Sequence, residues 1–484
     1  AGGLPEGDRP FLHDLLGLPQ PEAARTVYGA MDAGARLRGK SAMLERLLAA
    51  ASQRQPRLLA IEDAHWADPT TRHLLARLAA AATGCATLLA ITTRFEGDPF
   101  DATWRAESAG GHAATIDLRP LRPEDCKSLA VGVIDRLDAF AQQCIERAEG
   151  NPLFLEQLLR SHLADPAGRL PHSLQGVVLA RLDSLADSDK QALQAASVLG
   201  QRFALDDLRA LMGSADYDGR NAVQRQLLRP EGDGYLFAHA LIRDGIYASL
   251  TRERRRNLHT QAALRFAERD PALEAEHLDR AEDPSAPRAY LRAAEAEAAA
   301  YRPDRAIALA TRGLELATRD EDRVRLCLVA GRLRLDTGLA KPARAAFEIA
   351  VAAATDAVDR CRGLIGLAAA NRILADLGQA MEFLEQAEAI AAAVDSPALL
   401  SEIHYLRGNL HFARGEGGPC EQEHRQALMA AKRAGLPEWK ARARSGLGDA
   451  AYLQGRVGTA RRQFEVCVGI AQKHDLLRII PANR

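Results

Sequence analysis

The sequence lacks the features of membrane, secreted and strongly charged proteins. No apolar run approaches the ~18 residues that a membrane-spanning helix needs. The net charge is −1, so no global field draws the chain to nucleic acid or to an anionic membrane. The 7 cysteines are scattered without a CxxC pair, which argues against a zinc site or a disulfide framework. We therefore expect reduced thiols and a cytoplasmic location.

The chain is nevertheless long and rich in helix-forming residues. Its 484 residues are enough for about three domains of ~150 residues each. Alanine, leucine and arginine are abundant and aromatic residues make up only 5%, a composition that favours helix. The sequence opens on Ala1 rather than Met and its last helical unit has no evident cap. We therefore expect a fragment that is open at both ends.

An apolar run that ends in two acids is the most informative segment. Residues 58–61 are apolar and lead directly into Glu62 and Asp63. Such a run predicts a strand buried on both faces of a parallel sheet, and acids at its carboxyl end lie at the ligand-binding edge. Adjacent carboxylates there can hold Mg²⁺ and orient or deprotonate a water molecule. The pattern indicates the Walker B strand of a P-loop NTPase. The alternative is a buried strand whose acids merely cap the next helix.

Two further strands are predicted downstream. Residues 86–94 form a second apolar run that ends in hydroxyls and Arg94. In P-loop ATPases with an inserted strand, a polar residue at this strand end senses the γ-phosphate, and Arg94 is a candidate for that role. A surface arginine after a strand is the alternative. A third, short strand is expected at residues 114–118.

The pattern GxxxxGKS at residues 34–41 has the form of a phosphate-binding loop. Such a loop follows a buried strand and wraps phosphate at a helix N-terminus. Residues 26–33 do not make a convincing strand, and two arginines inside the loop would be unusual. We interpret the match as chance, in a loop that happens to fit. Residues 40–53 are expected to form an amphipathic helix.

The middle of the chain predicts helices and one small hairpin. Residues 149–156 break one helix and start another, with Pro152 well placed at a helix start. Residues 171–212 are predicted to be helical, and residues 232–239 to form the second strand of a hairpin that leads into a helix. This order suits a winged-helix unit. The basic run at 252–256 is interpreted as a solvated helix face rather than a nucleic-acid contact, because no aromatic residues interleave with it.

From about residue 285 the sequence becomes an array of Ala-rich helices with internal repetition. Similar helices recur at intervals of about 40 residues, and a glycine precedes each second helix. This spacing predicts tetratricopeptide-like helix pairs, which bind partners along a concave face. A plain helical bundle is the alternative. The aligned positions are Phe347, Phe383, His424 and Phe464, and the glycines are Gly338, Gly378, Gly415 and Gly455.

Taken in order, these pieces resemble the STAND class of signal-transduction ATPases. The resemblance rests on residues 58–68, 90–94, 150–155, 170–174 and 237–244. It extends to the ATPase-plus-repeat portion of bacterial class III adenylate cyclases, in which a cyclase domain lies N-terminal to the ATPase. LuxR-type regulators share the same ATPase and repeat architecture.

The resemblance implies a role for five residues. Glu62 would lie beside Mg²⁺ and Asp63 would handle the attacking water, so both are candidate catalytic and metal residues. Arg94 would be the sensor at its strand end. Pro152 would pack near the adenine ring. His239 would touch the ADP β-phosphate and hold a closed state, although a structural role for this histidine stays open.

The sequence therefore predicts a three-part signalling ATPase. The expected fold class is an incomplete α/β P-loop NTPase core, then a helical and winged-helix region, then an α-solenoid of tetratricopeptide-like repeats. The expected boundaries are 1–135, 136–284 and 285–484, with the P-loop upstream of Ala1.

The expected function is a regulatory ATP-binding module that controls an adenylate cyclase output domain. ATP or ADP and Mg²⁺ are the expected cofactors of the intact protein. A protein partner or a small-molecule inducer is expected on the repeats, and homo-oligomerisation on ATP binding is one behaviour the class allows. Membrane binding is not expected, and nucleic-acid binding is disfavoured. The alternatives are the ATPase portion of a LuxR-type transcriptional regulator and a non-catalytic repeat scaffold with a degenerate ATPase core.

Overall fold

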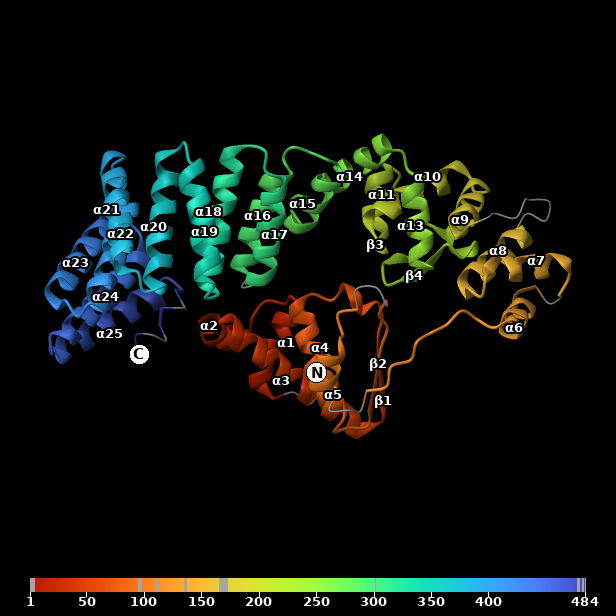
Figure 1. Cartoon of the computed structure of the whole chain (residues 1–484), viewed down its shortest axis with the longest axis horizontal. Coiled ribbons are helices and arrows are strands. Elements are labelled where there is room, and N and C mark those ends of the chain that lie inside the picture. The colour runs from red at the N-terminus through yellow and green to blue at the C-terminus, as the bar shows by residue number, and fades with distance from the viewer. Residues whose placement is uncertain are drawn as a thin grey trace. The chain divides into compact units, whose positions relative to one another are not determined.

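A computed structural model describes residues 5–94, 98–109, 113–134, 137–164, 173–300, 302–476, 479–480 and 483 (Figure 1). Contacts within the chain divide it into two compact units, and we describe each by itself. Unit 1 comprises Ala1–Thr115, Glu297–Ile307 and Arg319–Arg484, and unit 2 comprises Ile116–Ala296 and Ala308–Thr318. Residues 170–172, which contribute to the resemblance noted above, lie outside the described residues.

The first part of unit 1 is a small α/β region. Its elements are η1 (Glu6–Asp8), α1 (Arg9–Leu15), α2 (Glu22–Ala30), α3 (Ala33–Arg54), β1 (Arg57–Ile61), η2 (Ala64–Trp66), α4 (Pro69–Ala82), β2 (Thr87–Ile91) and α5 (Ala102–Ala109). β1 and β2 are parallel and pair in register, from Arg57 opposite Thr87 to Ile61 opposite Ile91. Parallel strands need a crossover connection, and α4 supplies it.

Both strands bury only one face, so the prediction of strands buried on two faces is wrong for the described residues. Ile61 and Ile91 pack with Leu75 in a small apolar cluster. Leu58 and Leu88 point the other way and are 70% and 67% exposed. Successive side chains of a strand alternate between faces, and α4 packs against β2 on one side only. An apolar face therefore stays open to solvent.

The strand expected at residues 114–118 does not form. This segment has no regular secondary structure, and Ile116 and Leu118 are 80% and 91% exposed. Within the part of the chain that is described, β1 and β2 pair only with each other. A segment with an alternating apolar pattern forms a strand only where the edge of a neighbouring strand can accept and donate its backbone hydrogen bonds. The pattern alone was therefore not sufficient to predict a strand here.

Unit 2 contains helices and one three-stranded antiparallel sheet. The chain runs through α6 (Pro123–Ile134), α7 (Ala139–Ala148), α8 (Pro152–Ala164), α9 (Leu174–Asp183), α10 (Asp187–Leu199), β3 (Arg202–Ala204), α11 (Leu205–Met212), α12 (Arg220–Gln224), β4 (Leu228–Glu231), β5 (Gly234–Phe237), α13 (Ala240–Ser249), α14 (Arg252–Phe266), α15 (Pro271–Arg280) and α16 (Ala286–Ala299). The strand order is β3-β5-β4.

The predicted hairpin and the helix that follows it are both present. β4 and β5 pair from Leu228 opposite Phe237 to Glu231 opposite Gly234. The connection between them is Gly232 and Asp233, and Gly232 has φ of 57°, which two-residue hairpin turns require and glycine adopts readily. The sheet packs with α10, α11 and α13, which are the elements of the expected winged-helix unit.

Two apolar cores lie in unit 2, and α9 contributes to both. The first core joins α6, α7 and α8 around Leu155. The second joins the winged-helix elements around Phe237. On α9, Val177 belongs to the first core and Val178 to the second, so this short helix couples the two groups.

The basic run at residues 252–256 lies in the first turns of α14. Arg252 forms an ion pair with Glu282, and the Arg256 Nε donates to the carbonyl of Ala281 at 2.8 Å. The guanidinium of Arg255 lies 4.7 Å from the centre of a neighbouring aromatic ring, that of Tyr247. These contacts attach the run to the protein's own helices and agree with its interpretation as a helix face.

The C-terminal part of the chain is the predicted helical solenoid. The helices are α17 (Pro303–Leu316), α18 (Asp320–Asp336), α19 (Ala340–Ala353), α20 (Ala357–Ile373), α21 (Leu377–Ala393), α22 (Pro397–Ala413), α23 (Gly417–Arg433), α24 (Pro437–Leu453) and α25 (Val457–Lys473). From α18 onward they form pairs, because each helix packs against the next and first helices also contact the following first helix.

A repeated contact between a small and a large residue holds each pair together. The eighth residue of each second helix is the large one, and Gly331, Gly408 and Gly448 on the first helices contact three of them. A Cβ added at these glycines would lie within 2.4–2.7 Å of the facing ring, so only glycine fits. The large residues are Phe347, Leu384, His424 and Phe464.

In one repeat, the predicted position of the large residue is wrong by one residue and that of the turn glycine by three. Leu384, which is fully buried, occupies the place assigned to Phe383, which is half-buried. The turn residue of that repeat is Ala375 rather than Gly378. Ala375 has φ of 65°, and the corresponding Gly338, Gly415 and Gly455 have φ of 81°, 74° and 73°. The prediction assigned the turn to Gly378 because no glycine occupies the true turn position, where Ala375 adopts the left-handed conformation.

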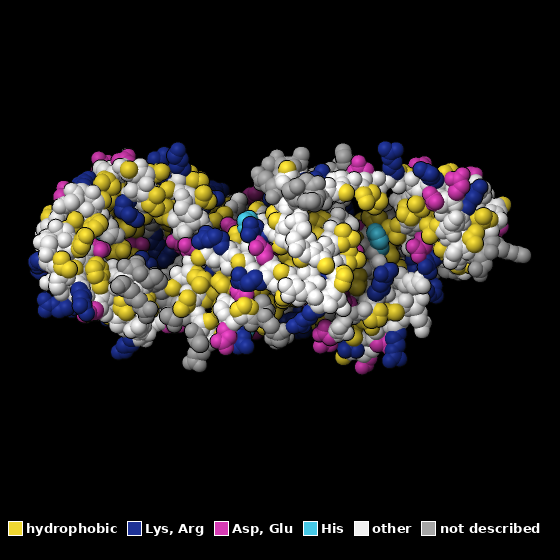
Figure 2. All heavy atoms as spheres, turned by 90° about the horizontal axis from the view of Figure 1, so that it is seen from below, with side chains coloured by type: hydrophobic (Ala, Val, Ile, Leu, Met, Phe, Trp, Pro, Cys, Tyr) yellow, Lys and Arg dark blue, Asp and Glu magenta, His cyan; other side chains and the backbone are white. Residues whose placement is uncertain are grey.

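Charges of both signs are interspersed on the face of the molecule drawn in Figure 2. This agrees with the near-zero net charge. In the described ranges, no helix is both long and apolar enough to cross a bilayer.

Candidate functional site

The parallel register brings the two strand ends together. Glu62 and Asp63 follow β1, and Thr92 follows β2. The Thr92 N–H donates to the carbonyl of Ile61 at 2.9 Å, and the Ala64 N–H donates to the carbonyl of Thr92 at 2.9 Å. The Asp63 N–H donates to the Thr92 hydroxyl at 3.0 Å. The carboxyl ends of both strands are thus hydrogen-bonded into one edge.

Asp63 holds an unusual backbone conformation at this edge. Its φ of 52° and ψ of 38° are left-handed, a region that aspartate and asparagine tolerate better than most residues. Its side chain does not cap η2. Both Glu62 and Asp63 are exposed, so their carboxylates are accessible to a ligand. The helix-capping alternative therefore does not account for Asp63.

Arg94 lies beyond β2 and is exposed. Its carbonyl accepts a hydrogen bond from the Thr93 hydroxyl at 3.4 Å. No ion pair or hydrogen bond joins its guanidinium to Glu62 or Asp63 within the described structure. The structure therefore places Arg94 on the same edge as the acids without bringing the charges into contact.

His65 belongs to this edge and was missed by sequence reasoning. Its side chain is only 10% exposed, and the described residues offer neither ring nitrogen a hydrogen-bond partner. The Nδ1 lies 4.0 Å from the nearer Asp63 carboxylate oxygen. Its ring packs on Trp66, with centroids 5.2 Å apart. In the sequence, the only hint of a functional role is the position of this histidine two residues after Asp63. The neighbouring Trp66 favours the interpretation that His65 is an ordinary packing residue.

The residues of the GxxxxGKS pattern lie inside α3 and do not form a loop. Their backbone groups are part of a continuous helix from Ala33 to Arg54. Lys40 forms an ion pair with Asp14 at 2.7 Å, and the Ser41 hydroxyl donates to the carbonyl of Leu37 at 2.9 Å. A phosphate-binding loop needs free amides at a helix start. The chance interpretation holds, although the segment is helical rather than a loop.

Pro152 opens α8 at a well-defined helix break in unit 2. Glu149 and Gly150 have φ of 49° and 79°, and the Asn151 side chain accepts a hydrogen bond from the Phe154 N–H at 3.0 Å. A Cβ at Gly150 would lie 2.7 Å from the carbonyl of residue 121, so glycine is required. The motif thus has a complete structural explanation as an N-cap followed by proline. Pro152 itself is exposed.

His239 caps α13. Its Nδ1 accepts a hydrogen bond from the Leu241 N–H at 3.2 Å. A neutral imidazole that accepts at Nδ1 carries its proton on Nε2. His239 is exposed, so this Nε2–H can donate to an external acceptor such as a phosphate oxygen. The structural and the ligand-binding interpretations of this residue are therefore compatible.

The two acids fit a magnesium ion that phosphate oxygens share, and not a protein-only metal cage. Mg²⁺ is usually held by one or two carboxylates together with substrate phosphates and water. Glu62 and Asp63 could supply those carboxylates. Across the described ranges, no group of three or more His, Cys, Asp or Glu side chains could hold a metal ion by itself.

Comparisons with known proteins agree with this architecture. No protein-family profile matches the chain. An uncharacterized protein of Rhizobium meliloti (strain 1021) is 30% identical over 246 residues, which cover 45% of this chain and 23% of that protein. The chain thus spans about a quarter of the length of the curated relative it matches.

One solved structure is similar over almost the whole chain. It is a Signal Transduction ATPase with Numerous Domains (STAND) protein with a tetratricopeptide repeat sensor, from Pyrococcus horikoshii. The TM-score is 0.59 at 13% identity, over 96% of this chain and 68% of that chain. A thermophilic tetratricopeptide repeat protein of Thermus thermophilus is 25% identical, with a TM-score of 0.34, over 40% and 98% of the two chains. The first likeness shows a shared fold with tetratricopeptide-like repeats.

Proposed function

We propose that this chain is the regulatory ATP-binding module, of the STAND type, of a multidomain signalling protein. The observation that carries the proposal is the likeness to a STAND protein over 96% of the chain. It is supported by the exposed acids at the β1 edge and by an available imidazole N–H at the start of α13.

Each candidate residue has a chemical task in this proposal. Glu62 holds Mg²⁺ on the phosphates and Asp63 orients the attacking water. Arg94 senses the γ-phosphate. When ADP is bound, Pro152 packs near the adenine and the Nε2–H of His239 donates to the β-phosphate. That contact favours a closed state, and ATP favours an open one.

The repeats bias this equilibrium by binding a protein partner or a small inducer. A ligand shifts a two-state protein only through its differential affinity for the two states. The output is an adenylate cyclase domain elsewhere in the protein, the setting is the cytoplasm, and ATP binding permits homo-oligomerisation. The open apolar face with Leu58 and Leu88 supports a larger α/β core, because parallel sheets are normally covered on both sides.

Two substitutions of His239 separate its possible roles. His239→Asn keeps an N-cap acceptor, and asparagine is among the best capping residues, whereas His239→Ala removes the cap as well. We expect both variants to lose about tenfold or more in ADP affinity, measured by calorimetry on the full-length protein, while only the alanine variant loses stability. ADP affinity that His239→Asn leaves unchanged would assign the residue to capping alone.

A non-catalytic repeat scaffold is the second candidate. It is favoured by one observation, the helical state of residues 34–41, which leaves the described residues without a phosphate-binding loop. In that case neither ATP nor ADP binds to the full-length protein. Asp63→Asn distinguishes the candidates further, because asparagine tolerates the left-handed conformation but cannot bind Mg²⁺ as a carboxylate. If the protein is a scaffold, Asp63→Asn should leave the measured binding of ATP and ADP unchanged.

A further inference from the structure

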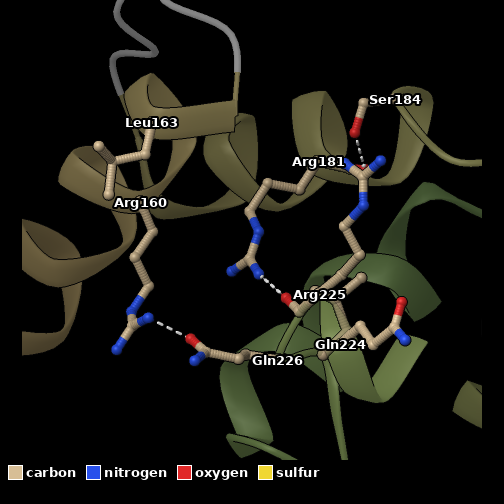
Figure 3. A pocket seen from close by; sticks show the side chains of 8 residues that line it. Arg160, Leu163, Arg181, Ser184, Gln224, Arg225 and Gln226 are labelled. Carbon is tan, nitrogen blue, oxygen red and sulfur yellow. Dashed lines mark hydrogen bonds between the residues drawn. The ribbon is translucent and has the colours of Figure 1, made fainter. Parts of the chain in front are cut away.

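Three arginines converge on a pocket in unit 2, and none of them is among the candidate residues discussed above. The pocket has a volume of about 280 Å³ and lies between α8, α9 and the turn from α12 to β4 (Figure 3). Arg160 comes from α8, Arg181 from α9 and Arg225 from the end of α12. The other lining residues are Leu163, Ser184, Gln224, Gln226 and Leu227.

Two of the arginines are held in place by neutral partners. Arg160 donates to the side-chain oxygen of Gln226, and Arg181 donates to the side-chain oxygen of Gln157 and to the backbone carbonyl of Arg225. Gln226 has φ of 54°, so the turn that presents it is held in a left-handed conformation. These contacts orient both guanidinium groups, and Arg181 is oriented by neutral partners alone.

Positive charge exceeds negative charge at this pocket. Glu156 pairs with Arg160 at 2.6 Å and is the one carboxylate that contacts the three arginines in the described part of the chain. The guanidinium of Arg225 has no hydrogen-bond or ion-pair partner there. Among the described side chains, three guanidinium groups and one carboxylate leave two uncompensated positive charges. Burial, followed by the charges of Arg160 and Arg225, lowers the pKa of Arg181 to about 10.

We propose that this pocket binds the phosphate group of a small molecule, at a site separate from the nucleotide site proposed above. Guanidinium groups bind phosphate oxygens through paired, charge-assisted hydrogen bonds. The Gln224 amide offers a further donor, whereas the Ser184 hydroxyl already donates to the carbonyl of Arg181 at 2.8 Å. The volume of about 280 Å³ lies just below the roughly 300–1,000 Å³ typical of ligand pockets, which suits a phosphate on a compact organic group rather than a protein segment.

The site also has a mechanical consequence. Arg160 lies eight residues after Pro152 on α8, which is roughly 12 Å along a helix at 1.5 Å per residue. A phosphate bound there would join α8, in the first core of unit 2, to the turn that leads into the winged-helix sheet. The ligand would therefore stabilise the packing of α8 and α9 against the winged-helix elements.

The test is a calorimetric titration of pyrophosphate into the full-length protein at ~50 mM salt, with ADP present at saturation. Arg225→Gln is the test variant, since this exposed side chain makes no contact that the fold needs. Arg220→Gln is the matched control. Arg220 is the first residue of α12, which ends just before Arg225, and its side chain is 84% exposed and pairs with Asp218 outside the pocket.

We expect pyrophosphate to bind the wild type and Arg220→Gln equally. Arg225→Gln should bind about tenfold or more weakly, as expected for loss of one charge-assisted contact. Arg160→Gln should weaken binding similarly. Absence of binding to the wild type would overturn the proposal, as would an equal loss in Arg220→Gln or no loss in Arg225→Gln. Citrate serves as a non-phosphate anion. If it bound as tightly as pyrophosphate, the pocket would be a general anion site and its assignment to a phosphate group would be overturned.

Discussion

Replacing His424 by phenylalanine should stabilise the repeats, and more so in acid. His424 is fully buried at the position that Phe347 and Phe464 occupy in other repeats. Its ring contacts Gly408 and Gly446 just as those phenylalanines contact their glycines. Neither ring nitrogen has a hydrogen-bond partner among the described residues. Phenylalanine fits the same niche and has no polar atom to desolvate.

The magnitude follows from two terms. Removing unpartnered buried polar atoms should gain about 1–3 kcal/mol at pH 7. Burial lowers the pKa of His424 to about 4, with His411 adding to that direction and Glu423 opposing it. The unfolded histidine, with a pKa of about 6.5, binds the proton more tightly, so stability falls as pH drops from 6.5 towards 4. The loss at pH 5 is about 2 kcal/mol, and the phenylalanine variant should not show it.

Hydrogen exchange of α22, α23 and α24, measured by mass spectrometry between pH 5 and pH 7, reports the local opening free energy of this repeat. The readout is the difference between variant and wild type at each pH. Two other buried histidines, His259 and His277, also have pKa values lowered by burial, to about 3 and about 4, and both proteins share them. If the difference did not grow from pH 7 to pH 5, the assignment of an unprotonated, unpartnered His424 would be wrong.

Two other predictions concern packing. Gly448→Ala should destabilise α24 and α25 by about 1–3 kcal/mol, because its Cβ would lie 2.4 Å from the ring of Phe464. Gly458→Ala, where nothing lies within 4 Å, should be neutral or stabilising by up to about 1 kcal/mol, and circular dichroism melts compare the two. Leu58→Thr with Leu88→Thr should change the stability of this chain by less than about 0.5 kcal/mol. A loss of several kcal/mol would mean that the β1–β2 face is already covered.

The repeats were the part of the fold that sequence could predict best. Their period, the small residues at helix crossings and the left-handed turns all carry a local signal, and Ala375 misled the register because alanine rarely holds positive φ. The β4–β5 hairpin was equally readable from its Gly-Asp turn. The absence of a strand at 114–118 could not be predicted, because strand pairing depends on a neighbouring strand that the local sequence does not reveal.

The candidate site was predictable only in part. The acids at 62 and 63 follow from an apolar run that stops abruptly, and the structure adds that Thr92 ties them to the next strand. His65 could not be recognised, because only burial shows that both its nitrogens lack partners among the described residues. The arginine pocket was also invisible in the sequence. Its three residues are far apart along the chain and meet only through the packing of α8 and α9 against the winged-helix turn.

Nucleotide-dependent hydrogen exchange on the full-length protein would test the central claim most directly. The measurement compares residues 58–66 and residues 237–243 with and without saturating ADP. The account predicts that ADP slows exchange in both segments, and that His239→Asn removes the effect at the second while the first retains part of its protection. Unchanged exchange in both segments, at ADP concentrations up to millimolar, would contradict a nucleotide-controlled module and favour the scaffold.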